Sequence, residues 1–392
     1  MKMKIKVIIA MLFSALLLSG QVIDSKTAYA SEALMPFIKS GELPGIISVF
    51  CRGNVQETAC LGWADVKSKR PITLDSMFMQ CSQTKGFCGV TIAILVEEGK
   101  ISLDDPVSKY LPEFKNLKVR TKGGIVPAKN VLTIRMVMNH TGGFSFEIPT
   151  KIKRGWVGLS LRETAREAAS IPLLFEPGTA VKYSNTGIDI GAAVIEVVTG
   201  KPWDQFLKER VLDPLEMKDT TFNPTDEQLA RSISMYYFTA GKKAKFMAFN
   251  KWMPLPHNGP SVFPSAGAGL WTTARDQLRF YKMLMNLGKG ENGVRILKEA
   301  TVKNLLATST RPANLKYYSL GLNVNNNGNM GHGGAWRTSC TVNWKTRQLQ
   351  LRVVQLNGNC KVINRACERA AQKFFRSKFD TSGTDAYTGR LK

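Results

Sequence analysis

The chain has 392 residues, of which 44% are apolar, so it is long enough to bury a large core in one domain or in two lobes. It carries 54 basic and 30 acidic side chains, a formal net charge of +24. The basic residues are scattered and no nucleic-acid-binding motif is present, so nucleic acid is not an expected partner. The charge would permit electrostatic association with anionic cell-envelope material. The sequence does not predict the oligomeric state.

The first thirty residues have the three parts of a secretory signal peptide. Lysines open the chain, an apolar run covers 7–18, and Ala28-Tyr29-Ala30 places small residues where signal peptidase reads them. We therefore predict cleavage after Ala30 and a secreted or periplasmic protein. An uncleaved anchor is the alternative, although the run is short for a bilayer span.

Cysteine and histidine usage does not point to a metal site. The seven cysteines form no Cys-x-x-Cys pair, and the three histidines form no His-x-His or His-Glu-x-x-His motif, so no metal or organic cofactor is expected. Export would permit disulfides, but an odd count leaves at least one thiol outside any pair within the chain. The sequence does not define which cysteines pair.

The first half of the chain changes from strands to helices. Apolar, β-rich runs at 46–51 and 58–63 flank Arg52-Gly53-Asn54 and predict a hairpin. Capping residues and apolar periodicity then predict a series of helices. They are expected at 82–98 ending at Gly99, after Thr133, after the capping box of Ser160 and Glu163, and over 186–199, 203–211 and 274–287.

Strands return near the C-terminus. The runs 338–344 and 349–356 predict a second hairpin, followed by a basic amphipathic helix over 362–379 and a polar tail over 380–392. Strands at both ends with helices between them predict an α+β fold. In one domain over 31–379, residues 34–80 and 290–379 would form a central antiparallel sheet, and 81–289 a mostly helical lobe.

The tetrapeptide Ser82-Gln83-Thr84-Lys85 opens the first long apolar helix. A serine and a lysine three residues apart share one face of a helix. An amine without its proton can activate the hydroxyl as a nucleophile, and the free N–H groups of a helix N-terminus suit an oxyanion. Alone the spacing is a weak signal, since a helix cap followed by a surface lysine gives the same pattern.

A second motif is Tyr183-Ser184-Asn185. A tyrosine beside a lysine can share a proton with it, because an ammonium group lowers the pKa of the phenol. Asn185 offers an amide that can hold a substrate carbonyl or position the lysine. The same residues would also serve as the start of a helix, and the two interpretations are compatible.

A third motif is Gly331-His332-Gly333-Gly334-Ala335, expected just before a strand. Glycines here would let the backbone approach a substrate closely, and the N–H of Ala335 could join that of Ser82 in an oxyanion hole. A plain glycine turn into the hairpin is the alternative. The Gly/Ala-rich segment 264–271 either lines the cleft or forms a tight packing loop.

In this order, the three motifs resemble those of the serine β-lactamase-like family, which holds class C β-lactamases, D-alanyl-D-alanine carboxypeptidases and related esterases. The flanking segments 78–85, 95–107, 140–144 and 175–179 resemble it too, so the similarity covers about residues 34–377. The resemblance implies a β-lactamase/transpeptidase-like fold. It also implies an acylated Ser82, acid–base roles for Lys85 and Tyr183, substrate binding by Asn185, and an oxyanion held by the N–H groups of Ser82 and Ala335.

Two positions depart from the family pattern. His332 stands where the β-lactamases proper carry the lysine of Lys-Thr-Gly, so the cleft lacks that fixed positive charge and β-lactamase activity becomes less expected. Arg337 stands where a small residue is more usual. Strand alternation would place it on the same face as Ala335, where we hypothesise that its guanidinium binds a substrate carboxylate. His332, Gly333 and Gly334 are also expected to contact the substrate. A lateral salt bridge or solvent exposure is the alternative.

We therefore predict an exported serine hydrolase that forms an acyl-enzyme on an ester or amide. Short-chain esters or small amides and peptides rank first as substrates, then D-alanyl peptides, then β-lactams. The alternatives are a β-lactamase or D-alanyl-D-alanine carboxypeptidase, or a penicillin- or peptide-binding sensor that acylates without turnover. An α/β-hydrolase is excluded because the chain contains no Gly-x-Ser-x-Gly.

Overall fold

A computed structural model describes residues 29–146, 160–247, 263–312, 314–315 and 317–377, and the backbone of Val22–Ile23. The predicted tail over 380–392 and nearly all of the predicted signal peptide lie outside these residues. The predicted cleavage site after Ala30 falls inside the first helix, where Ala30 is buried and its N–H donates to Glu57 Oε1 at 2.8 Å.

The described helices are accompanied by a few short 3₁₀ and π turns. The α-helices are α1 Tyr29–Lys39, α2 Thr84–Glu97, α3 Ile134–Met138, α4 Leu161–Ser170, α5 Asn185–Thr199, α6 Trp203–Leu207, α7 Asp226–Ala230, α8 Ala274–Met285, α9 Glu299–Thr301 and α10 Lys361–Arg376. The 3₁₀ turns are η1 Cys81–Gln83, η2 Val107–Lys109 and η3 Pro112–Phe114, and the π turns are η4 Lys208–Leu212 and η6 Val302–Leu306.

The described strands gather mainly at the two ends of the chain. They are β1 Val22–Ile23, β2 Gly45–Arg52, β3 Val55–Asp65, β4 Arg70–Pro71, β5 Met77–Met79, β6 Lys118–Thr121, β7 Gly124–Pro127, β8 Met235–Thr239, β9 Lys242–Met247, β10 Trp271–Thr273, β11 Asn323–Val324, β12 Asn329–Gly333, β13 Ser339–Asn343, β14 Gln348–Val353 and β15 Leu356–Gly358.

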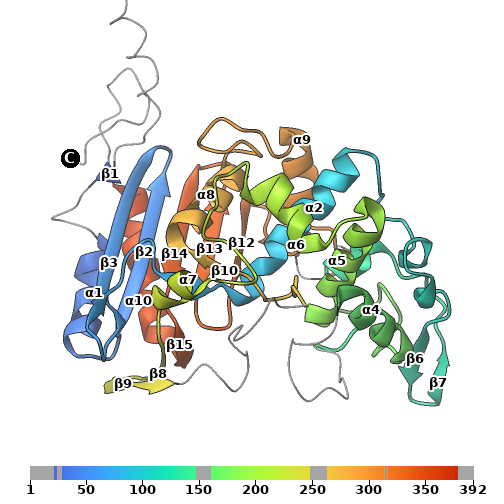
Figure 1. Ribbon diagram of the computed structural model, residues 1–392, viewed down its shortest axis with the longest axis horizontal. Helices are drawn as coiled ribbons and strands as arrows, with labels where there is room; N and C mark the ends of the chain where they lie inside the picture. The colour runs from blue at the N-terminus through green and yellow to red at the C-terminus, as the bar shows by residue number, and fades with distance from the viewer. Residues whose placement is uncertain are drawn as a thin grey trace, which may run out of the picture.

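The main sheet joins the N-terminal and C-terminal parts of the chain. Its order is β1-β3-β2-β14-β13-β12-β11, antiparallel throughout except for β1 beside β3 (Figure 1). The two ends meet where β14 pairs with β2, with Leu351 opposite Val49. The predicted central antiparallel sheet is therefore confirmed.

Helices cover both faces of this sheet, and side-chain alternation along β2 explains why. Ile46 and Phe50 point to the face covered by α1 and α10, where Phe50 meets the ring of Phe374 at 5.8 Å. Ile47 and Val49 point to the opposite face and join the large core that α8 and α2 complete. A strand buried on both faces must be apolar at nearly every position, as β2 is.

The second lobe is built on α2, α4 and α5. Figure 1 shows α2 running from the sheet into this lobe, with α4, α5 and the β6–β7 hairpin beyond it. Thr84–Leu95 of α2 are all buried, which accounts for a helix that is apolar all round. The predicted caps are present: Thr133 caps α3, Ser160 and Glu163 form a capping box on α4, and Gly200 ends α5 with φ +68°.

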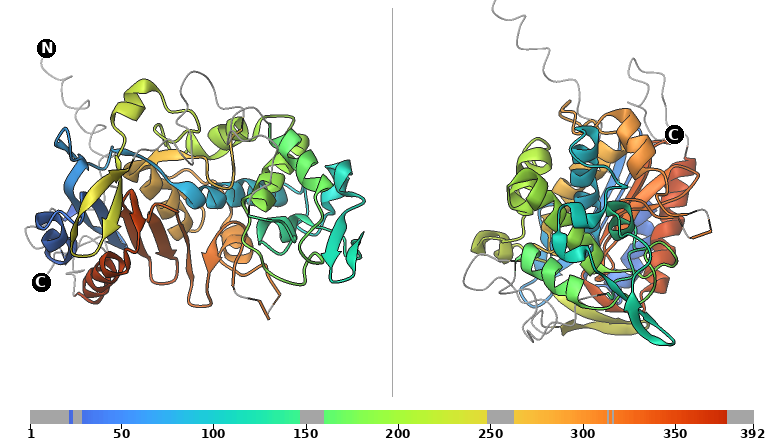
Figure 2. Two further views of the ribbon diagram at one scale, coloured as in Figure 1. Left: turned by 90° about the horizontal axis from the view of Figure 1, so that it is seen from below. Right: turned by 90° about the vertical axis from the view of Figure 1, so that its right-hand side faces the viewer.

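Several predicted boundaries require correction. The helix expected from Ser82 opens as the η1 turn before α2, and the strand expected to reach Leu356 ends at Val353. The segment 356–358 is instead β15, which pairs in parallel with β8 in a separate small sheet. The β8–β9 hairpin and α8, both expected in the helical lobe, pack with the sheet, as the left view of Figure 2 shows for the hairpin.

Two further expectations from the sequence concern disulfides and a membrane anchor. All seven thiols are free in the structure; six are buried and Cys60 is exposed. In the described ranges, the helices are all too short or too polar for a membrane span.

Candidate active site

Ser82 lies in a sharp turn between β5 and α2. Cys81 adopts a left-handed conformation with φ +51°, unusual for a residue with a side chain, and this reverses the chain direction just before the serine. Thr84 stabilises the turn by donating its hydroxyl to the carbonyl of Cys81 at 2.7 Å. Ser82 is half-buried at the N-terminus of the α2 region, at the junction of the sheet and the helical lobe.

Lys85 is fully buried one helical turn after Ser82. Its Nζ donates to Asn185 Oδ1 at 2.5 Å and to the carbonyl of Gly267 at 2.6 Å. A buried ammonium needs such partners, because removing a charge from water without them is very unfavourable. Three segments far apart in the sequence thus fix the amine: α2, the start of α5 and the 264–271 loop.

Tyr183 connects the amine to the serine. Lys85 Nζ lies 4.6 Å from the centre of the Tyr183 ring, and the side chain of Ser82 is close enough to the phenol to lower its pKa. Burial raises the pKa of Tyr183 to about 12, although the side chain of Ser82 lowers it in part. The expected lowering of this pKa by the lysine is therefore wrong for this structure: desolvation is the larger effect, and the phenol is neutral near pH 7.

His332 is a buried, neutral residue of β12. Its Nδ1 lies 2.6 Å from the carbonyl of Gly333 and donates to it, so Nε2 accepts from Tyr318 Oη at 3.2 Å and faces Tyr183 Oη at 3.4 Å. Burial first, and then the charge of Lys85, lower the pKa of His332 to about 3. The motif was expected just before a strand, but His332 and Gly333 are the last two residues of β12.

Gly334 and Ala335 bring the end of β12 against the turn that contains Ser82. A Cβ on Gly334 would lie 2.4 Å from the carbonyl oxygen of Gln80, so only glycine fits this approach. The backbone N–H of Ala335 is close enough to the Cys81 thiol to hydrogen-bond with it. Ala335 therefore lies beside the residue that precedes Ser82, as an oxyanion hole shared by Ser82 and Ala335 requires.

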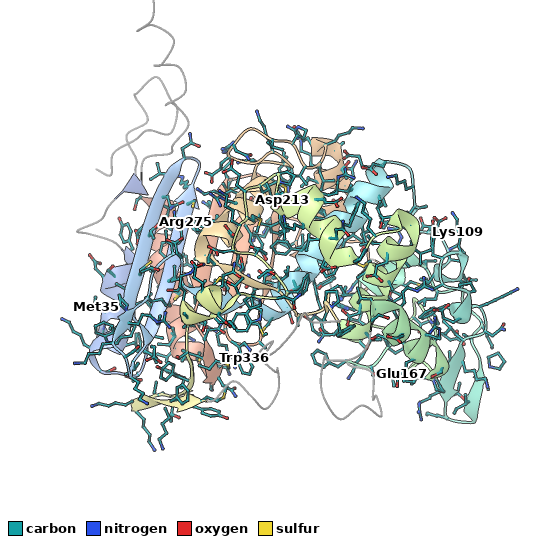
Figure 3. All side chains as sticks on the ribbon, viewed as in Figure 1. Met35, Lys109, Glu167, Asp213, Arg275 and Trp336 are labelled. Atoms are coloured by element: carbon teal, nitrogen blue, oxygen red, sulfur yellow. The ribbon has the colours of Figure 1, made fainter. Side chains whose placement is uncertain are left out.

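Arg337 occupies a turn and not a strand. Its φ is +67°, β13 begins only at Ser339, and its guanidinium donates to the carbonyl of Gly358 at 2.6 Å. The strand alternation that placed Arg337 beside Ala335 is therefore wrong. The neighbouring Trp336, labelled in Figure 3, packs against the cluster of Met77, Met79, Cys81 and Trp271.

Asp189, which no sequence motif indicated, holds the loop whose Gly267 carbonyl accepts from Lys85. Asp189 is buried, and its Oδ1 accepts from Gly267 N–H at 2.9 Å and from Ser265 Oγ at 3.1 Å. Burial raises its pKa to about 7, while the Gly267 hydrogen bond and the Lys85 charge act in the opposite direction. The available signal was an acidic residue four positions after Asn185, on the same face of an otherwise apolar helix.

Two aromatic neighbours were also not assigned to the site. The ring of His140 lies 4.5 Å from that of Tyr183 and 4.6 Å from that of Tyr318. His140 was expected to be a structural turn residue; it is buried, has φ +67°, and accepts from the N–H of Ser184. For Tyr318 we find no local sequence signal, because tertiary packing alone brings it to His332.

Among the described residues, no group of three or more His, Cys, Asp or Glu side chains is arranged to hold a metal ion. The contacts described above bring a serine, a lysine and a tyrosine together between an antiparallel sheet and a helical lobe. This combination of fold and side chains defines a serine β-lactamase-like site.

Comparison with known proteins agrees with that class. The model of the family described as Beta-lactamase matches residues 31–354, so the chain belongs to the beta-lactamase family. Protein Rv1367c of Mycobacterium tuberculosis is 30% identical over 276 residues, covering 67% of each chain. Esterase EstB of Burkholderia gladioli is 28% identical over 267 residues, covering 62% of this chain and 66% of EstB.

The solved structures support the fold. The structure titled EstCE1, a hydrolase with promiscuous acyltransferase activity, superimposes with a TM-score of 0.73 at 22% identity. The match covers 88% of this chain and 97% of EstCE1. The predicted β-lactamase/transpeptidase-like fold is confirmed.

Proposed function

We propose that this member of the beta-lactamase family is an exported serine hydrolase that forms an acyl-enzyme on Ser82. One observation carries the proposal. A fully buried lysine, held by two carbonyl acceptors, lies one helical turn from a serine whose side chain interacts with a partly buried tyrosine. A structural serine needs no such arrangement, whereas a nucleophile needs a base and a proton donor within reach.

In the acylation step, Lys85 in its neutral form takes the hydroxyl proton of Ser82, and Ser82 Oγ bonds the carbonyl carbon of the substrate. The carbonyl electron pair moves to oxygen, where the N–H groups of Ser82 and Ala335 stabilise the charge. When the intermediate collapses, the bond between the carbonyl carbon and the leaving group breaks. The oxygen or nitrogen of the leaving group takes a proton from the phenol of Tyr183, and Lys85 then gives its proton to Tyr183. Because burial keeps Tyr183 protonated, it acts as the proton donor, and Lys85 is the base.

Water then completes turnover. It adds to the acyl-enzyme carbonyl as its proton passes to the Lys85–Tyr183 pair, and collapse returns a proton to Ser82 Oγ and releases a carboxylic acid. Asn185 serves both sides of the cycle, because its Oδ1 holds Lys85 while its amide nitrogen can donate to a substrate carbonyl.

Short-chain esters or small amides and peptides are the first-ranked substrates, followed by D-alanyl peptides and then by β-lactams. The neutral state of His332 supports this order, since the position supplies no fixed charge to attract an acidic substrate. Similarity to a protein named an esterase also supports it. Export rests on the N-terminal sequence pattern and is tested by N-terminal sequencing of the protein recovered outside the cytoplasm.

Intact-mass spectrometry tests the chemistry directly. The protein is incubated with activated esters of increasing chain length and with a penicillin, and the mass is followed over time. We expect ester adducts that form and disappear in the wild type, none in Ser82→Ala, and unchanged behaviour in Ser170→Ala, an exposed serine at the end of α4. Adducts that persist would indicate the sensor alternative, and adducts on Ser82→Ala would disprove the assignment.

A further inference from the structure

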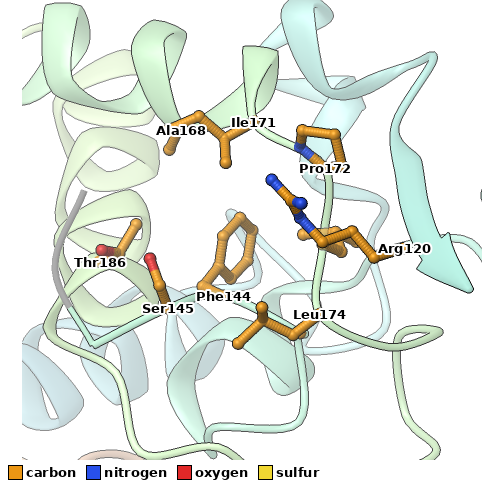
Figure 4. Close-up of a pocket in the computed structure, with 10 residues that line it drawn as sticks. Arg120, Phe144, Ser145, Ala168, Ile171, Pro172, Leu174 and Thr186 are labelled. Carbon is orange, nitrogen blue, oxygen red and sulfur yellow. The ribbon is translucent and has the colours of Figure 1, made fainter. Parts of the chain in front are cut away.

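A pocket of about 360 Å³ lies in the helical lobe, and neither Ser82, Lys85, Tyr183 nor His332 lines it. Its walls come from Gly143–Ser145, the end of α4, the segment 171–174, the first turn of α5 and the β6 strand (Figure 4). This volume is at the lower end of the range for small-molecule sites, about 300–1,000 Å³.

The lining of the pocket is apolar with one cation. Phe144, Ala168, Ile171 and Leu174 form walls, and Leu174 is 42% exposed although it is a large apolar side chain. Figure 4 shows Arg120 across the pocket from Thr186 and Ser145. Among the described lining residues, no acidic side chain is present to neutralise Arg120.

Two polar groups in this lining have no partner in the described structure. Arg120 is an exposed residue whose guanidinium makes no ion pair or side-chain hydrogen bond with the described residues, while its backbone N–H donates to the carbonyl of Leu173. Thr186 is buried, and its Oγ1 has no hydrogen-bond partner. A buried hydroxyl without a partner is unfavourable by about 1–3 kcal/mol.

We propose that this pocket binds a medium-chain carboxylate, with the carboxylate on Arg120 and the chain against Phe144, Ile171 and Leu174. Arginine pairs with a carboxylate through two parallel N–H donors, and the walls offer the apolar area that a chain of about eight carbons would bury. The charge of Arg120 excludes a cationic ligand, and the absence of other charge among the described lining residues disfavours a zwitterion.

The pocket is connected to the active site through one tripeptide. Phe144 lines the pocket, the carbonyl of Ser145 accepts from Ser184 Oγ at 2.7 Å, and the carbonyl of Phe146 accepts from Asn185 N–H at 2.8 Å. The ring of Phe146 also stacks on that of Tyr183, with centroids 6.0 Å apart. A carboxylate in the pocket therefore contacts the segment that supports Tyr183 and Asn185.

This coupling rests on the proposed function, because a carboxylate is also the product that Ser82 would release. The binding itself does not depend on that function. It is measured with octanoate on the full-length Ser82→Ala protein by isothermal titration calorimetry, so a failure of turnover leaves the binding test intact.

The expected result is saturable binding of octanoate that Arg120→Gln weakens by about tenfold or more. Arg166→Gln, which removes an exposed arginine of α4 outside the pocket, should bind as tightly as the parent protein. Ala168→Phe should abolish binding by filling the pocket. Because Ala168→Phe can also misfold, the affinity of Arg120→Gln for octanoate is the measurement that tests the proposal. Equal affinity of Arg120→Gln and the parent, or equal affinity for octanol and octanoate, would overturn the proposal.

Turnover by the wild type supplies a second measurement. Octanoate bound in this pocket should change kcat at saturating ester, and the change should vanish in Arg120→Gln, whose basal activity stays at the wild-type level. Purely competitive inhibition that Arg120→Gln retains would place octanoate at Ser82 and would contradict the coupling.

Discussion

Asp189 offers the most specific test of how Lys85, the proposed base, is held. Asp189→Ala removes the acceptor of Ser265 Oγ and of Gly267 N–H, both of which are buried. Gly267 N–H still reaches Ser265 Oγ at 3.2 Å, so the net loss is about one buried acceptor. We expect the free energy of unfolding to fall by about 1–3 kcal/mol. Asp189→Asn keeps an oxygen at the same place and should cost about 1 kcal/mol or less.

The same residue predicts a pH dependence with a definite sign. Burial raises the pKa of Asp189 to about 7 from a usual value near 4. Between these pH values the folded protein holds a proton that the unfolded chain has released. Stability therefore falls as the pH rises through this window, by at most about 1.4 kcal/mol per pH unit. Asparagine does not titrate, so Asp189→Asn should gain stability relative to the wild type between pH 5 and pH 8.

Urea denaturation at pH 5 and pH 8, together with ester hydrolysis, measures both effects. Because the carbonyl of Gly267 holds Lys85, we expect Asp189→Ala to lower kcat by about tenfold, or about 1.4 kcal/mol of activation free energy, with a smaller change in KM. Asp276→Asn is the control, since Asp276 is a buried carboxyl on α8 that bonds Thr220 away from the site. It should lose stability and keep kcat. Wild-type kcat in Asp189→Ala, or an unchanged stability difference between the two pH values in Asp189→Asn, would refute the reasoning.

Three further substitutions test other parts of the site. The pKa of His332 is lowered to about 3, so the free energy of unfolding of the wild type should fall as the pH drops below about 6.5. His332→Gln should show a smaller difference in the free energy of unfolding between pH 4 and pH 7, measured by denaturation. An equal difference in the two proteins would contradict this prediction. In Gly267→Ala, the new Cβ would lie 2.7 Å from Asn185 Cβ, so kcat should fall and the free energy of unfolding should decrease by about 1–3 kcal/mol. Wild-type kinetics in this variant would show that the close contact does not matter for activity. Arg337→Ala loses the bond to Gly358, so charged and neutral esters should slow equally; a loss confined to carboxylated esters would instead establish the carboxylate role.

The sequence by itself determined most of the elements and the family, and it indicated the side chains on which the proposed chemistry depends. Apolar periodicity and caps are local signals, so the hairpin at 45–65, the cap at Ser160 and the end of α5 at Gly200 could be read directly. The spacing of Ser82 and Lys85 predicted a shared helix face, because one helical turn fixes that geometry without the rest of the fold. The order of the motifs was sufficient to identify the family.

Only the tertiary structure decided how those residues are held and charged. The lysine depends on Asn185, 100 positions later in the chain, and on Gly267, 182 positions later, and no local pattern encodes such contacts. Burial is also a property of the whole fold, so the neutral states of Tyr183 and His332 became visible only when the surrounding chain excluded water. Arg337 shows the same limit. Strand alternation is a rule for strands, and the positive φ that places Arg337 in a turn depends on how β12 and β13 are joined across the sheet.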